Sequence, residues 1–245
     1  MDFLQSHYKD EVMNLSGCDL KEFPMELLEF KEMKVLNLHC NKLTSIPPDA
    51  SAPTPVGAEI GQLINLKVLN LTYNLLTTLP KEIGQLTNLH ILNLAYNQVI
   101  TSIPPEIGQL SNLQFLDIHN NQLESLPEEI GQLSNLQELY LSLNKFTIFP
   151  TMIGKLVNLK LLSLGQNSLT SIPPEIGQLT NLQQLSFYAN KLTSIPEEIG
   201  QLVNLQELCL SFNKFTIFPT MIGKLVNLKI LSFRGNSLTY SSKIF

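Results

Sequence analysis

Residues 128–150 read EEIGQLSNLQELYLSLNKFTIFP, and residues 197–219 repeat this stretch with only three substitutions. Within each copy, the leucines and one asparagine follow the pattern LxxLxLxxN, where x is variable. Self-similarity at a fixed spacing predicts that one structural unit is stacked along the chain. The substituted pairs are Ser134 and Val203, Tyr140 and Cys209, and Leu143 and Phe212.

The pattern recurs ten times when the chain is aligned on this asparagine, and most of these anchors are 23 residues apart. The interval from Asn97 to Asn121 has one extra residue. Another interval has ten extra residues, 49–58, whose Ala, Pro, Ser and Thr content predicts a surface loop. The anchors are Cys18, Asn41, Asn74, Asn97, Asn121, Asn144, Asn167, Asn190, Asn213 and Asn236.

Each unit predicts a short strand followed by a helical turn. Leu139 and Leu141 are two residues apart, so both point to one face of a strand, and stacked neighbours can bury them. The proline in IPPEIGQL stops the strand, and Gly177 with its counterparts permits either close packing or a positive φ. The asparagine before each strand, such as Asn158, is interpreted as a turn former.

The unit LxxLxLxxNxLTxLPxEIGQLxN resembles leucine-rich repeats. Its second half is most similar to the intracellular subtype of plant Ras-group-related proteins, animal Ras-binding scaffolds and bacterial repeat-only proteins such as those of Leptospira. The resemblance implies an α/β solenoid, an arc of about ten 23-residue repeats, with a parallel sheet on the concave face and short helical or 3-10 turns on the convex face.

The resemblance also implies that the ten anchors form a ladder that satisfies backbone groups buried between turns, and the family pattern allows Cys18 in this column. We expect residues 1–11 to form a short N-terminal cap. Residues 12–245 are expected to form a single solenoid with the loop insertion at 49–58.

Charge and cysteine content bear on the class of partner and on the cellular compartment. A net charge of −5, with Lys and Arg spread thinly, disfavours nucleic acid or an anionic membrane as the partner. Cys18, Cys40 and Cys209 cannot all pair and lack metal-site spacing, which favours free thiols in a reducing compartment. The N-terminus lacks the basic start and apolar run of a signal peptide. We therefore expect a cytoplasmic protein without metal or cofactor; secretion by a non-classical route is the alternative.

Residues that flank the core leucines are expected to face the concave groove, because strand side chains alternate. Between residues 135–170 and 204–239 six positions differ, and five of them flank core leucines, which fits a copied scaffold whose groove was changed. Tyrosine favours binding because its rigid ring has a polar tip. The alternative is that the rings only pack along the sheet. The candidate partner-binding residues are Tyr73, Tyr96, Phe115, Asp117, His119, Tyr140, Leu143, Tyr188 and Phe212.

Three functions are considered. The first is a non-catalytic protein-binding scaffold, for which the resemblance implies a small GTPase or a phosphatase as partner. The second is a pathogen-derived effector that binds a host protein. The third is a hydrolase-like enzyme that uses Asp117, His119 and Ser142, which should project from adjacent strands. A regular sheet uses its backbone amides in the ladder and leaves no oxyanion hole, so this third function is the least favoured.

The last repeat is expected to expose apolar side chains. Terminal repeats of a solenoid need polar caps, and the sequence stops soon after the tenth predicted strand. We expect an apolar edge around Leu231, Phe233 and Leu238, and end-to-end self-association through this edge.

Overall fold

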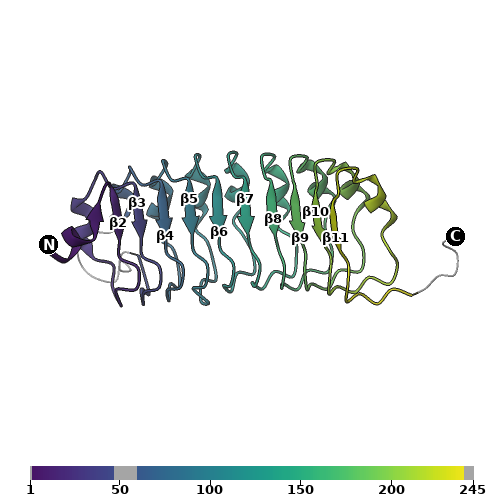
Figure 1. The fold of residues 1–245 in the computed structure, drawn as a ribbon, viewed down its shortest axis with the longest axis horizontal. Coiled ribbons are helices and arrows are strands. Elements are labelled where there is room, and N and C mark those ends of the chain that lie inside the picture. The colour runs from purple at the N-terminus through teal and green to yellow at the C-terminus, as the bar shows by residue number, and fades with distance from the viewer. Residues whose placement is uncertain (1, 47–59, 240–245) are drawn as a thin grey trace.

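The computed structural model describes residues 2–46 and 60–239, so the predicted insertion at 49–58 lies outside the described residues. The described chain forms one elongated solenoid, in which strands lie side by side on one face and short helical turns lie behind them (Figure 1). The fold class predicted from the repeat pattern is confirmed.

A single sheet contains eleven strands in sequence order. Strands β2 to β11 are parallel, and their register places equivalent residues side by side, so that Leu139 pairs with Leu116 on one side and with Leu162 on the other. This register follows from the constant repeat length. The strands are β2 (Val12–Asn14), β3 (Val35–Asn37), β4 (Val68–Asn70), β5 (Ile91–Asn93), β6 (Phe115–Asp117), β7 (Glu138–Tyr140), β8 (Leu161–Ser163), β9 (Gln184–Ser186), β10 (Glu207–Cys209) and β11 (Ile230–Ser232).

Each turn crosses the convex face through a short 3-10 helix. The residue before each helix, where it is described, is a proline in extended conformation. This proline ends the part of the repeat that contains the strand. None of the helices in the described ranges is long and apolar enough to cross a membrane. The helices are η1 (Met25–Glu29), η2 (Ile60–Gln62), η3 (Lys81–Gln85), η4 (Pro105–Gln109), η5 (Glu128–Gln132), η6 (Thr151–Lys155), η7 (Pro174–Gln178), η8 (Glu197–Gln201) and η9 (Thr220–Lys224).

The core is one continuous column of apolar side chains between the sheet and the 3-10 helices. Leu139 and Leu141 are fully buried, as are Phe146 and Phe215, which take the place of leucine in the two copied units. One turn alone cannot bury this surface, so each turn depends on its neighbours for stability.

The glycines of the 3-10 helices allow consecutive turns to approach closely. A Cβ on Gly84 would lie 2.5 Å from the backbone oxygen of Glu106 in the next turn. Among the described glycines, positive φ occurs only at Gly17 and Gly235, outside these helices. Of the two roles that the sequence left open for this glycine column, the structure therefore supports close packing.

Two N-terminal elements precede the first repeat strand. Helix α1 (Asp2–Ser6) buries Leu4 against the core, and β1 (Tyr8–Lys9) pairs antiparallel with β2. The Tyr8 ring packs edge-on against Phe30, with their centroids 4.8 Å apart. These contacts support our proposal that the first eleven residues cap the solenoid.

Candidate binding face

Side chains of the anchor asparagines link each turn to its neighbours. Asn144 Nδ2 donates to the backbone oxygens of Ile118 at 3.0 Å and Leu141 at 3.1 Å, and its Oδ1 accepts from the Leu123 N–H at 2.9 Å. These backbone groups lie where water cannot reach them, so the amide supplies their hydrogen bonds. Equivalent sets of bonds are made by Asn41, Asn74, Asn97, Asn167, Asn190, Asn213 and Asn236.

Two anchors depart from this pattern. The Nδ2 of Asn121 donates as in other turns, but its buried Oδ1 has no hydrogen-bond partner among the described residues. The preceding turn is the one with an extra residue, whereas in a regular turn the N–H two residues after the preceding anchor donates to this oxygen, as that of Leu123 does to Asn144. The Cys18 Sγ, at the first anchor, lies 3.8 Å from the Ser16 backbone oxygen and 4.0 Å from His7 Nε2.

A second asparagine column, interpreted from the sequence as turn formers, makes a further ladder that the sequence analysis missed. Asn158 Nδ2 donates to the Ser134 backbone oxygen at 2.8 Å, and this bond is exposed to solvent. The signal was the strict recurrence of asparagine, which a turn alone does not require. The column consists of Asn65, Asn88, Asn112, Asn135, Asn158, Asn181, Asn204 and Asn227.

The residue before each anchor has a left-handed backbone, which the sequence analysis also missed. Gly17 and Gly235 occupy this position in the first and last repeats, with φ of 69° and 72°. Every turn between them places a residue with a Cβ there, at a cost of roughly 1 kcal/mol each. We call this column the left-handed rim; it consists of Cys40, Tyr73, Tyr96, Asn120, Leu143, Gln166, Ala189 and Phe212.

An aromatic array that includes two residues of this rim lies at the ends of strands β3 to β6. The Tyr73 and Tyr96 rings are stacked, with centroids 4.2 Å apart and an interplanar angle of 6°. His39 packs edge-on to Tyr73 at 5.5 Å, and His119 packs edge-on to Tyr96 at 4.5 Å. Partial burial and the Tyr96 hydroxyl raise the pKa of the Tyr73 phenol. Each tyrosine ring therefore has two aromatic neighbours, and Tyr73 is still 46% exposed.

The three groups considered for hydrolysis do not form a triad. His119 Nδ1 lies 2.7 Å from Asp117 Oδ1, which also accepts from the His119 backbone N–H at 3.0 Å. The Ser142 hydroxyl instead bonds to the Ser163 hydroxyl at 2.7 Å. The structure therefore brings together Asp117 and His119 but pairs Ser142 with the next strand.

The remaining candidate aromatics form two smaller groups. Phe115 packs against Tyr140 at 5.4 Å, and the Tyr140 hydroxyl donates to Glu138 Oε2 at 2.9 Å. Burial, followed by this hydrogen bond, raises the pKa of Tyr140. Tyr188 packs edge-on to Phe212 at 5.4 Å. Tyr140 also lines an open trough.

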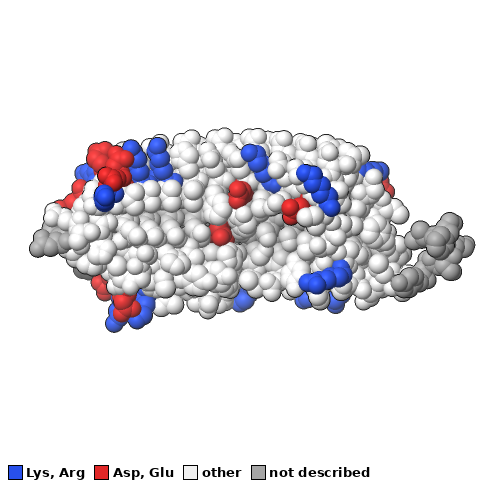
Figure 2. All heavy atoms as spheres, viewed as in Figure 1, with Lys and Arg blue, Asp and Glu red and all other residues white. Residues whose placement is uncertain are grey.

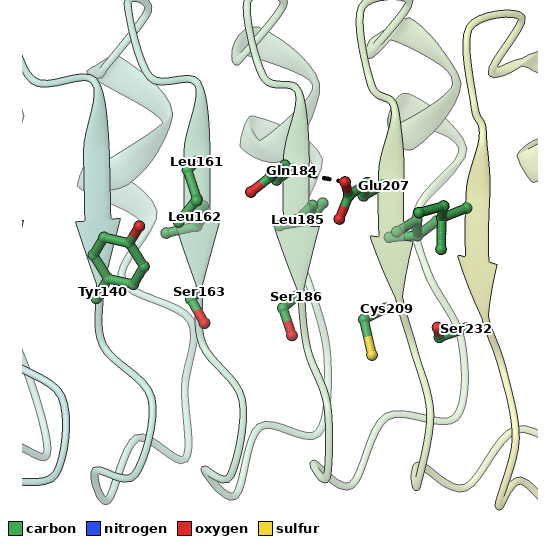
Figure 3. A pocket seen from close by; sticks show the side chains of 12 residues that line it. Tyr140, Leu161, Leu162, Ser163, Gln184, Leu185, Ser186, Glu207, Cys209 and Ser232 are labelled. Carbon is green, nitrogen blue, oxygen red and sulfur yellow. Dashed lines mark hydrogen bonds between the residues drawn. The ribbon is translucent and has the colours of Figure 1, made fainter.

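The trough runs across the sheet from β7 to β11 and has a free volume of about 190 Å³ (Figure 3). Tyr140 stands at its first strand, and the positions between the core leucines are small from there on. Glu207 points toward Gln184, whose Nε2 lies 3.4 Å from Glu207 Oε1 (Figure 3). The small residues that line the trough are Ser163, Ser186, Cys209 and Ser232.

Charge is sparse on this face of the molecule. Figure 2 shows its middle as mostly uncharged, with isolated acidic and basic side chains, while charged side chains of both signs gather near the N-terminal end. Within the described ranges, no Lys or Arg forms an ion pair with Glu138 or Glu207; the pairs found are Lys34 with Glu11, Lys42 with Asp19, and His119 with Asp117.

The parallel sheet, the 3-10 turns and the asparagine ladder define a leucine-rich-repeat solenoid. The chain belongs to the leucine-rich repeat family, because the family model described as a leucine-rich repeat region matches residues 12–144, 94–163 and 148–243. Leucine-rich repeats commonly serve as protein-interaction modules and are typically non-enzymatic.

Solved and curated relatives are longer than this chain. A leucine-rich-repeat protein of Leptospira interrogans is 44% identical with a TM-score of 0.83, over 90% of this chain and 54% of that chain. A TDR receptor is 30% identical with a TM-score of 0.67, over 88% of this chain and 45% of the receptor chain. Leucine-rich repeat-containing protein 10 of Bos taurus is 38% identical over 65 residues, which is 26% of this chain and 20% of the relative.

Proposed function

We propose that the chain is a non-catalytic scaffold that binds a protein partner on its concave face. The left-handed rim carries this proposal. Tyr73, Leu143 and Phe212 remain 46%, 36% and 45% exposed although each holds a backbone conformation that glycine would adopt at lower cost. Large, rigid aromatic side chains are typical anchors of protein interfaces, so a partner that contacts the rim would offset this cost.

Partner and location are further parts of the proposal. By family resemblance, a small GTPase or a phosphatase is the partner to test first, in the cytoplasm. The second candidate is an effector that acts on a host protein after export by a non-classical route, and the 44% identity to a bacterial leucine-rich-repeat protein favours it. The hydrolase has less support because Ser142 bonds to Ser163 rather than to His119.

Affinity capture from lysate with paired variants tests the proposal. The first variant is Tyr73→Asn with Phe212→Asn, because Asn120 shows that asparagine occupies the rim. Loss of two anchors should weaken a partner's binding by about a thousandfold, since one anchor contributes about thirtyfold. A micromolar partner would then be lost from the captured proteins, while the melting temperature stays close to that of the native chain.

The control variant is Val157→Ser with Val226→Ser, which removes two exposed apolar side chains that lie just after 3-10 helices. It should capture the same partner as the native chain. Loss of the partner by the valine variant and retention by the rim variant would place the interface off the concave face and contradict the proposal.

A further inference from the structure

The two similar stretches, 128–150 and 197–219, differ at a residue that contacts a glutamate carboxylate in the first copy. In the first copy, the hydroxyl of Tyr140 donates to Glu138 Oε2 at 2.9 Å. In the second copy, Cys209 replaces this tyrosine, while Glu207 stands where Glu138 does. No phenol on its own strand covers Glu207, and its hydrogen bond from Gln184 is long, at 3.4 Å. The substitution therefore exposes a carboxylate that the first copy covers.

The same substitution opens space beside that carboxylate. Figure 3 shows the small side chain of Cys209 on the same strand as Glu207. Leu161 and Ile230 also line the trough. From β7 to β11 the trough crosses four strand spacings, or about 19 Å at ~4.8 Å each. An extended segment of about six residues has this length. The trough thus combines a carboxylate without a cationic partner, an apolar lining and the length of a short extended segment that would lie partly in it.

We propose that the trough binds an extended peptide segment of a partner and that Glu207 pairs with a Lys or Arg side chain of this segment. This inference rests on the proposed function, because it places part of the partner on the concave face. Charge complementarity favours a basic residue, since no cation in the described chain pairs with Glu207. Ile230, on the strand next to Glu207, would pack against the alkyl stem, and the serine hydroxyls would contact the peptide backbone.

A phage-displayed library of linear heptapeptides, panned on the purified chain, tests the inference. The selected peptides should share a Lys or Arg at one position. The best peptide is then synthesised and titrated calorimetrically. Glu207→Gln keeps the shape but removes the charge, and should weaken binding about ten- to a hundredfold. Cys209→Tyr should weaken it at least as much, because tyrosine fills the trough and covers Glu207 as Tyr140 covers Glu138.

Glu138→Gln is the matched control, because Tyr140 already covers this carboxylate; it should leave the affinity within about twofold. If Cys209→Tyr fails to fold, Glu207→Gln decides the result. The inference is overturned if no peptide is selected, or if the selected peptides lack a shared basic position. It is also overturned if Glu207→Gln binds the peptide as tightly as the native chain does, or if free spermidine binds at this site as well as the peptide does. Capture by the rim variants is measured separately, so this inference can fail while the proposed function holds.

Discussion

Two asparagine columns link neighbouring turns, and their exposure to water sets what each side chain contributes. Asn144 is buried, so its removal leaves backbone groups of three residues without a partner. Asn158 is exposed, so the carbonyl that it contacts can bond to water when the amide is removed. Stability should therefore depend on the buried column far more than on the exposed one.

Asn144→Ala is expected to lower the free energy of unfolding by about 3 kcal/mol, because each buried orphan group costs roughly 1–3 kcal/mol. Asn158→Ala should lower it by less than about 1 kcal/mol, since water replaces the lost bond. Equilibrium urea denaturation of both variants checks this. Equal losses at the two positions would contradict the account of the ladders.

Tyr140 should make stability fall in alkaline solution. Burial and the bond to Glu138 raise its pKa in the folded chain above the ordinary value of 10.0, so the folded state holds this proton more tightly than the unfolded state. The contribution is fully present below pH 10 and is lost as pH rises through the folded pKa. In denaturation from pH 8 to 11, Tyr140→Phe should show a shallower decline than the native chain. An unchanged decline would mean that Tyr140 titrates as an exposed tyrosine.

At the scale of one turn, the extra residue between Asn97 and Asn121 interrupts the ladder. Ile100 is buried where other turns bury the leucine after the anchor, so Val99, which is exposed, is the residue that lengthens the turn. The longer turn leaves Asn121 Oδ1 without a partner among the described residues.

Deletion of Val99 should restore the 23-residue spacing and the missing bond. We expect the free energy of unfolding to increase by about 1 kcal/mol, the usual contribution of such a bond. Deletion of the exposed Ser125, from a turn of regular length, is the control and should destabilise the chain. Thermal denaturation of the two deletion variants and the native chain measures these changes in stability. A lower melting temperature for the Val99 deletion would show that the turn needs its extra residue.

The strands, the 3-10 turns and the buried ladder could be predicted from the sequence, because they depend on a spacing of residues that recurs in each repeat. The left-handed rim could not be predicted, because glycine marks this position only at Gly17 and Gly235 and the turns between them have varied residues there. The bond between Tyr140 and Glu138 also escaped the sequence, since alternate residues of one strand meet only when a ring leans along the strand.

At the scale of the whole molecule, β11 is the last strand of the sheet among the described residues. In the described chain β11 pairs only with β10, and Leu231 and Leu238 are partly exposed. An edge strand with apolar side chains is a template for pairing with another chain. The expected self-association through this edge therefore stays a prediction about this chain.

Sedimentation velocity at rising concentration should show association of the native chain. Leu231→Glu with Leu238→Glu should suppress it, because the edge would then carry two charges. Ile148→Glu, at a side chain that is 78% exposed elsewhere on the solenoid, is the control and should leave association unchanged. A native chain that stays monomeric at every concentration would refute this prediction.

The sequence predicted which face of the sheet the candidate residues occupy, but not how their side chains pack. Alternation along the strands predicted Tyr140 on the groove face, and Tyr140 lines the trough. Tyr96 lies after strand β5, in the left-handed rim. The stacking of Tyr96 on Tyr73 and the trough beside Glu207 depend on side-chain directions and volumes, which the repeat pattern does not encode.

Hydroxyl-radical footprinting of the chain with its captured partner tests the central claim, that the concave face is the interface, most directly. Aromatic side chains react readily when exposed, so Tyr73 and Phe212 should be labelled in the free chain and protected in the complex. Val157 and Val226 should be labelled equally in both states. Protection of the two valines, with Tyr73 and Phe212 labelled as in the free chain, would contradict the account.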